Sequence, residues 1–188
     1  WSDEEVKSML RDSLVIISLH VDEKIDLPEG SNIVNKNGKK QRYYQIQETG
    51  KHYPGVTTIL NQTKPEQDKL QLNLWRQRVG YSEATRITQD ACNRGTIVHS
   101  QIESTLKQET FSPNDKVSGF WDSISPVLSH VSDPFLIEGC IYHSSWLYAG
   151  TVDCVAHWDG IPCILDWKTA SRAKKPEWIE DYKIQVAG

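Results

Sequence analysis

One stretch, Gly150–Ala170, constrains the fold more than any other part of the sequence. Within it, Asp159-Gly160 separates two strand-like runs, and this dipeptide is a preferred pair for a two-residue type I′ hairpin loop. If that turn forms, the register places Asp153 directly opposite Asp166. The sequence therefore predicts an antiparallel hairpin that carries two carboxylates on one face.

Lys168 is expected to join these carboxylates, because it follows Asp166 by two residues and projects from the same face. Cross-strand partners have Cβ atoms about 4.5–5.5 Å apart, so the three charged groups converge. A turn longer by one residue would move Asp153 to the other face. That other face is predicted to be an apolar core face, formed by Val152, Cys154, Ala156, Trp158, Ile161, Cys163, Leu165 and Trp167.

Two carboxylates at such a short distance repel each other unless a cation lies between them. Mg²⁺ and Mn²⁺ prefer carboxylate and water oxygens, and such an ion beside a lysine suits phosphodiester hydrolysis. The alternative is a surface salt bridge between Lys168 and one of the two aspartates on a solvated strand. Spacing alone favours neither interpretation, and the strongly apolar opposite face favours the metal site.

The remaining pattern places helices before strands and predicts an α/β protein with α+β order. Helices are expected over residues 3–20, 65–78, 82–106 and 117–128, with a kink near Gly95. Residues 27–40 are expected to be a loop and Arg42–Gln47 a short strand. The other strands are expected from residue 135 on, and a last helix near residue 176. Residues 1–40 are predicted to form an acidic arm, and residues 41–188 the main domain.

The charge distribution leaves room for a nucleic-acid partner despite a net charge of −4. Residues 1–30 hold eight acidic and three basic residues, whereas the rest of the chain carries a net charge of +1. No apolar run approaches the roughly 18 residues of a membrane span, so no membrane partner is expected. The four cysteines form no Cys-x-x-Cys pair, which predicts an intracellular protein with no iron–sulfur cluster within this chain.

Four motifs resemble, in order, the RecB-like branch of the PD-(D/E)XK nucleases. They are Gly95-Thr96-x-x-His99, Gly150-x-x-Asp153, Asp166-x-Lys168 and Gln185. Residues 52–63, the Trp75-Arg76 helix and residues 166–169 resemble more closely the mitochondrial genome maintenance exonuclease-like proteins. The resemblance covers about residues 42–188. It implies a restriction-endonuclease-like core, with a mixed central sheet flanked by helices.

The resemblance also implies the roles of single residues. Metal ligation would come from His99, Asp153, Asp166 and the backbone carbonyl of Trp167, with two Mg²⁺ or Mn²⁺ ions expected. Lys168 would be the catalytic lysine. Gln185 would belong to a Gln-x-x-x-Tyr motif whose tyrosine falls one residue past Gly188, so a domain truncated at its C-terminus is expected.

Several further residues are candidates, each with an ordinary structural alternative. From its helix alone, His99 is more often a packed core histidine, and Glu103 and Glu138 are either accessory acids or salt-bridge partners. DNA contacts are expected from Arg172, Lys174, Lys175 and Gln185, although a basic run is also a common solvated face. Unpaired bases could stack on Tyr142, Trp146 and Tyr148, which strands more often use as core residues.

Together these features predict a metal-dependent DNA exonuclease that acts on single-stranded ends. An endonuclease of the same superfamily and a non-catalytic DNA-binding module with the same fold are the alternatives. The resemblance implies a mitochondrial location in a eukaryote, and a cytoplasmic or viral one otherwise. The sequence indicates neither the polarity of digestion nor the oligomeric state.

Overall fold

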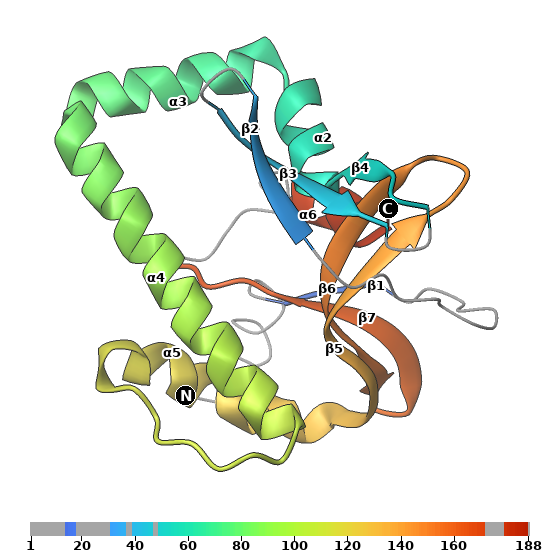
Figure 1. Ribbon diagram of the computed structural model, residues 1–188. Coiled ribbons are helices and arrows are strands. Elements are labelled where there is room, and N and C mark those ends of the chain that lie inside the picture. The colour runs from blue at the N-terminus through green and yellow to red at the C-terminus, as the bar shows by residue number, and fades with distance from the viewer. Residues whose placement is uncertain (1–13, 18–30, 37–38, 47–48, 172–178, 188) are drawn as a thin grey trace. The chain divides into compact units, whose positions relative to one another are not determined.

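The computed structural model describes residues 14–17, 31–36, 39–46, 49–171 and 179–187 (Figure 1). The chain forms two compact units. The first, here called the sheet unit, comprises Trp1–Gln62 and His130–Gly188, and the second, the helical unit, comprises Thr63–Ser129. Antiparallel sheets and separate helices confirm the predicted α/β class with α+β order.

Two sheets make up most of the sheet unit. The larger has the strand order β1-β7-β6-β5, and the smaller has the order β2-β3-β4. Every pair of neighbouring strands in both sheets is antiparallel. The strands are β1 (Leu14–Ile17), β2 (Ser31–Lys36), β3 (Lys39–Gln45), β4 (His52–Pro54), β5 (Val131–His143), β6 (Tyr148–Trp158) and β7 (Ile161–Trp167).

The two sheets are joined around a small buried cluster. Tyr44, Ile46, Tyr53 and Ala149 are each no more than 6% exposed and pack together. An isolated parallel bridge links Gly55 to Ala149 beside this cluster. The hydroxyl groups of Tyr44 and Thr151 lie 3.1 Å apart and hydrogen-bond across the junction. The smaller sheet is therefore fixed to β6, the strand that contains Asp153.

The helix predicted over residues 3–20 is wrong where the structure describes that segment. Leu14–Ile17 is the strand β1, which pairs with β7 along Val15↔Asp166 and its neighbours. Its sequence, Leu-Val-Ile-Ile, contains three β-branched residues, which favour an extended backbone. A four-residue apolar run cannot distinguish helix from strand by periodicity. Residues 3–13 and 18–20 lie outside the described residues.

The loop predicted over residues 27–40 is also wrong in its described part. Ser31–Lys36 forms β2 and pairs with β3 along its whole length. Strands β1 and β2 therefore pair with strands of the domain expected over residues 41–188. The boundary of an acidic arm at residue 40 stays a prediction.

Helices α3 (Glu66–Val79) and α4 (Tyr81–Leu106) of the helical unit confirm two predicted helices. Gly80, with φ of +88°, separates them, and α4 runs through Gly95 without interruption. The third predicted helix is divided into η1 (Asp115–Val117), α5 (Ser118–Ile124) and η2 (Ser125–His130), which runs on to the first residue of the sheet unit. The sheet unit itself adds α2 (Val56–Thr63) and α6 (Glu180–Ala187). No helix among the described residues combines the length and the apolar character that a membrane crossing requires.

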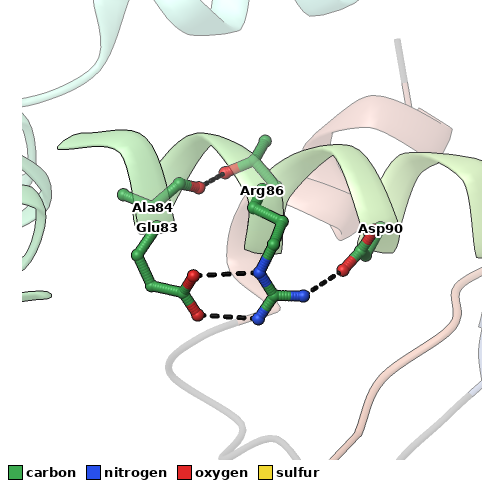
Figure 2. Close-up of polar contacts among 5 residues, drawn as sticks. Glu83, Ala84, Arg86 and Asp90 are labelled. Carbon is green, nitrogen blue, oxygen red and sulfur yellow. Dashed lines mark hydrogen bonds and ion pairs between the residues drawn. The ribbon is translucent and has the colours of Figure 1, made fainter. Parts of the chain in front are cut away.

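Side-chain pairs support the first turns of α4 (Figure 2). Arg86 donates to both carboxylate oxygens of Glu83, at 2.9 and 2.7 Å, and to Asp90 at 2.7 Å. These spacings of three and four residues are the ones at which helix side chains meet. The paired guanidinium lowers the pKa of the Glu83 carboxyl.

A glycine-to-alanine substitution tests the packing of β5. An added Cβ at Gly139 would overlap the side chain of Leu136, so that leucine would have to move. We expect Gly139→Ala to lower the free energy of unfolding by about 1–3 kcal/mol. Gly119→Ala is the matched control, because a Cβ there meets open space and alanine favours the α5 helix by up to about 1 kcal/mol. Urea unfolding followed by circular dichroism measures both, and equal stabilities for Gly139→Ala and the wild type would contradict this account.

Candidate active site

The hairpin of β6 and β7 has the predicted turn and register. Asp159 and Gly160 both have positive φ, +49° and +81°, as a type I′ turn requires. From this turn the partners run in register to Cys154↔Leu165. One residue farther along β6, the Asp153 carboxylate accepts a 2.7 Å hydrogen bond from the backbone N–H of Trp167. That bond anchors Asp153 beside the end of β7.

The predicted apolar face is buried for most of its length. Five of its eight residues are no more than 4% exposed, namely Cys154, Ala156, Cys163, Leu165 and Trp167. Ile161, next to the turn, is the exception at 57% exposed. The hairpin is thus held by the core along its middle and at Trp167, and not at its turn end.

Asp166 is the central acid of the opposite face, and it is only 5% exposed. Its Oδ1 atom accepts a 2.6 Å hydrogen bond from Lys168 Nζ and a 3.3 Å bond from Gln185 Nε2. Its Oδ2 atom is buried and has no hydrogen-bond partner among the described residues. A buried ionised carboxylate is costly unless it is paired and hydrogen-bonded, so this geometry does not fit a solvated surface salt bridge.

Helix α6 brings one side chain to this acid and another to its lysine partner. Gln185 reaches Asp166, and the ring of Tyr182 lies 5.3 Å from Lys168 Nζ. Residues three apart lie on one face of a helix, which places both on the side of α6 that meets β7. Sequence reasoning missed Tyr182, although its spacing from Gln185 was a usable signal. The lysine is therefore held between a carboxylate and an aromatic ring.

Glu138 supplies a third carboxylate from β5. The register Ile137↔Cys154 and Gly139↔Val152 puts Glu138 across from Asp153, and a carboxylate oxygen of each lies within 4.8 Å of the other. The β5–β6 register shifts between Ser132 and Leu136, and Glu138 itself has φ of +51°. A non-glycine residue in this conformation is strained and needs support from its surroundings.

The negative charges of Asp153 and Glu138 affect the pKa of a cysteine thiol in the core. Burial is the main cause that raises the pKa of the Cys154 thiol to about 12, and the nearby Asp153 and Glu138 carboxylates raise it further. Cys154 is fully buried and belongs to the opposite face of the same strand. A second thiol, that of Cys163, also has a raised pKa because it is buried. The described acids thus create a negative field at the end of the hairpin.

The remaining predicted site residues belong to the helical unit or lie outside the described residues. His99 and Glu103 are on α4 in the helical unit, where His99 is half-buried and Glu103 pairs with Lys107 at 2.6 Å. Their roles stay predictions. The basic residues Arg172, Lys174 and Lys175 lie outside the described residues.

Sequence comparison relates the chain to named proteins. It is 33% identical to mitochondrial genome maintenance exonuclease 1 of Homo sapiens over 129 residues, which is 64% of this chain and 38% of that protein. The mouse protein of the same name is 31% identical over 128 residues, and that of Xenopus tropicalis is 30% identical over 128 residues. The chain thus spans less than two fifths of the length of these relatives.

No family model matches the chain, so membership of the PD-(D/E)XK superfamily stays a prediction. The similarity to the three vertebrate proteins exceeds chance resemblance. It confirms the expected resemblance to mitochondrial genome maintenance exonuclease-like proteins. Over 64% of its length, the chain is similar in sequence to proteins named mitochondrial genome maintenance exonuclease 1.

Proposed function

We propose that this chain carries the active site of a metal-dependent DNA exonuclease, which hydrolyses phosphodiester bonds at single-stranded ends. The observation that carries the proposal is the buried carboxylate of Asp166, with Lys168 on one oxygen and no described hydrogen-bond partner on the other. An oxygen in that state is suited to a cation. The sequence similarity to proteins named as exonucleases supports the same activity.

The donor set fits Mg²⁺ or Mn²⁺. Asp166 Oδ2 and the carboxylates of Asp153 and Glu138 are hard oxygen donors, which both ions prefer. The backbone carbonyl of Trp167 and the imidazole of His99 complete the proposed ligands, on the strength of the motif resemblance. A bound divalent ion would supply Lewis acidity at the phosphate and a more acidic water at neutral pH. It would also offset the repulsion between Asp153 and Glu138.

The chain's own residues have distinct jobs in the proposed reaction. A water oxygen attacks phosphorus while the bond to the sugar oxygen breaks, and that oxygen leaves with the electron pair and takes up a proton. The ammonium of Lys168 orients the water and offsets the negative charge that builds on the phosphate oxygens. Gln185 and Tyr182 position Lys168 and Asp166, and the Trp167 N–H holds Asp153 in place.

The names of the relatives also suggest where the activity belongs. We extend their role in mitochondrial genome maintenance to this chain as a proposal, with a mitochondrial location if its source is eukaryotic. The proposed substrate is the single-stranded end of a DNA molecule.

Removing the lysine tests the catalytic assignment. We expect Lys168→Ala to lower the cleavage rate of labelled single-stranded DNA by about 100-fold or more, because transition-state charge loses its compensation. Affinity for the same DNA without metal should change by less than about threefold. Lys51→Ala, an exposed lysine of the sheet unit, is the control and should keep full activity. A Lys168→Ala protein that digests DNA at the wild-type rate would exclude the proposed role.

Metal binding is tested separately from cleavage. Calorimetric titration with Mn²⁺ should show binding to the wild type and at least about 10-fold weaker binding to Asp166→Asn. At one Mn²⁺ concentration, the melting temperature of the wild type should rise more than that of Asp166→Asn. Asp159→Asn is the control, because this turn aspartate pairs with His130 at 2.7 Å. The same titration of His99→Ala tests the proposed histidine ligand. Equal Mn²⁺ affinities of the wild type and Asp166→Asn would overturn the metal site.

Circular DNA distinguishes the proposed exonuclease from an endonuclease. An enzyme that needs an end should digest linear single strands and leave circular ones of equal length intact. Gel analysis with Mg²⁺ or Mn²⁺ measures both. Nicked circles would show an endonuclease, and no cleavage with no Mn²⁺ binding would favour a non-catalytic DNA-binding module.

A further inference from the structure

The hairpin of β5 and β6 ends in an exposed aromatic group far along the strands from the acids. The strands pair as far as His143↔Tyr148, and the turn between them is Ser144–Leu147. Trp146 in this turn is 74% exposed, more than any other large hydrophobic residue among the described residues. A cluster of exposed apolar side chains, unlike a single one, can mark an interaction site.

The rings at this hairpin tip form an ordered stack. His143 stacks on Trp146, with ring centroids 4.8 Å apart and planes 12° apart. It also stacks on Tyr148, at 5.7 Å and 28°. By contrast, Tyr142, another candidate for base stacking, packs inward against Tyr53 with centroids 6.0 Å apart.

The turn backbone fixes this stack in place. His143 Nδ1 accepts hydrogen bonds from the backbone N–H groups of Ser145 and Trp146, at 3.3 and 3.2 Å. The His143 carbonyl accepts a 2.8 Å bond from Leu147, which has φ of +58°. A strained residue persists only where its surroundings hold it, so the rings are oriented before any ligand arrives.

The chemistry of the tip selects a planar and uncharged partner. Residues 139–152 contain no Asp, Glu, Lys or Arg. No carboxylate within this stretch of the hairpin would repel a phosphate, and no fixed charge would hold a charged side chain of another protein. Flat aromatic faces favour another flat ring, and nucleic-acid bases stack on such side chains without regard to sequence.

We propose that Trp146, supported by His143 and Tyr148, is a stacking platform for an unpaired base of single-stranded DNA. This proposal rests on the proposed function. Tyr148 and Asp153 are five residues apart on β6, or about 17 Å along the strand. The stacked base would therefore belong to the same DNA strand as the scissile phosphate but lie away from it. Bases of a duplex are already stacked on their neighbours, so the platform favours unpaired DNA.

Two substitutions of Trp146, one that removes the aromatic ring and one that keeps a ring, test the platform. The probe is fluorescein-labelled oligothymidylate, and anisotropy in EDTA measures its binding without cleavage. We expect Trp146→Leu to raise Kd by about 5- to 100-fold, the range that loss of one stacked base implies. Trp146→Phe keeps a ring and should stay within about threefold of the wild type. Phe135→Leu is the matched control, because Phe135 is an aromatic residue of β5 that is 69% exposed.

Several outcomes would overturn the platform. One is Trp146→Leu binding oligothymidylate as tightly as the wild type, and another is Trp146→Phe losing as much affinity as Trp146→Leu. An equal loss of affinity for blunt duplex DNA would also exclude base stacking. Loss of self-association in sedimentation, with unchanged DNA affinity, would show that Trp146 contacts a second copy of the chain.

The same measurements separate this proposal from the proposed function. A wild type that cleaves DNA, combined with a Trp146→Leu variant of unchanged affinity, contradicts the platform alone. A wild type that binds oligothymidylate through Trp146 but does not cleave with Mn²⁺ contradicts the exonuclease alone. A wild type that neither binds nor cleaves contradicts both.

Discussion

The burial of one carboxylate, that of Asp166, is the constraint on which the rest of the site depends. A charge this far from water must be compensated, and two donors from different elements meet on a single oxygen. These two hydrogen bonds fix the side chain of Lys168, which directly follows β7, and that of Gln185 on α6. The second oxygen has no hydrogen-bond partner among the described residues, and it is the oxygen proposed to bind the cation. A single desolvated acid thus links the position of the lysine, the docking of the last helix and the proposed metal.

Backbone geometry positions the other two acids, Asp153 and Glu138, relative to the same hairpin. The type I′ turn sets the register of β6 against β7, and the N–H of Trp167 holds Asp153. On the far side of β6, the shifted register of β5 and the strained backbone of Glu138 bring a further acid within 4.8 Å of Asp153. Like charges across a strand pair destabilise a sheet, and the proposed cation would offset that repulsion.

The parts that local patterns determine were predictable from sequence. Asp159-Gly160 specifies its turn, and alternation along the two strands specifies their faces, so the central hairpin follows from local rules. Strands β1 and β2 do not follow from local rules, because their extended state depends on partner strands elsewhere in the chain. The Asn37-Gly38 dipeptide between β2 and β3 was a hairpin signal that the loop prediction overlooked. The contact of Tyr182 with Lys168 and the bulge near Glu138 arise from tertiary packing, which periodicity does not encode.

The pairing of β1 with β7 joins segments from opposite ends of the chain. Contacts of such long sequence separation form slowly, because the intervening loop must close first. During synthesis β7 leaves the ribosome well after β1, and only then does β1 gain its partner. Until the two meet, the edge of β7 that pairs with β1 offers unpaired backbone groups to any other strand, so an unpaired β7 edge is prone to aggregate.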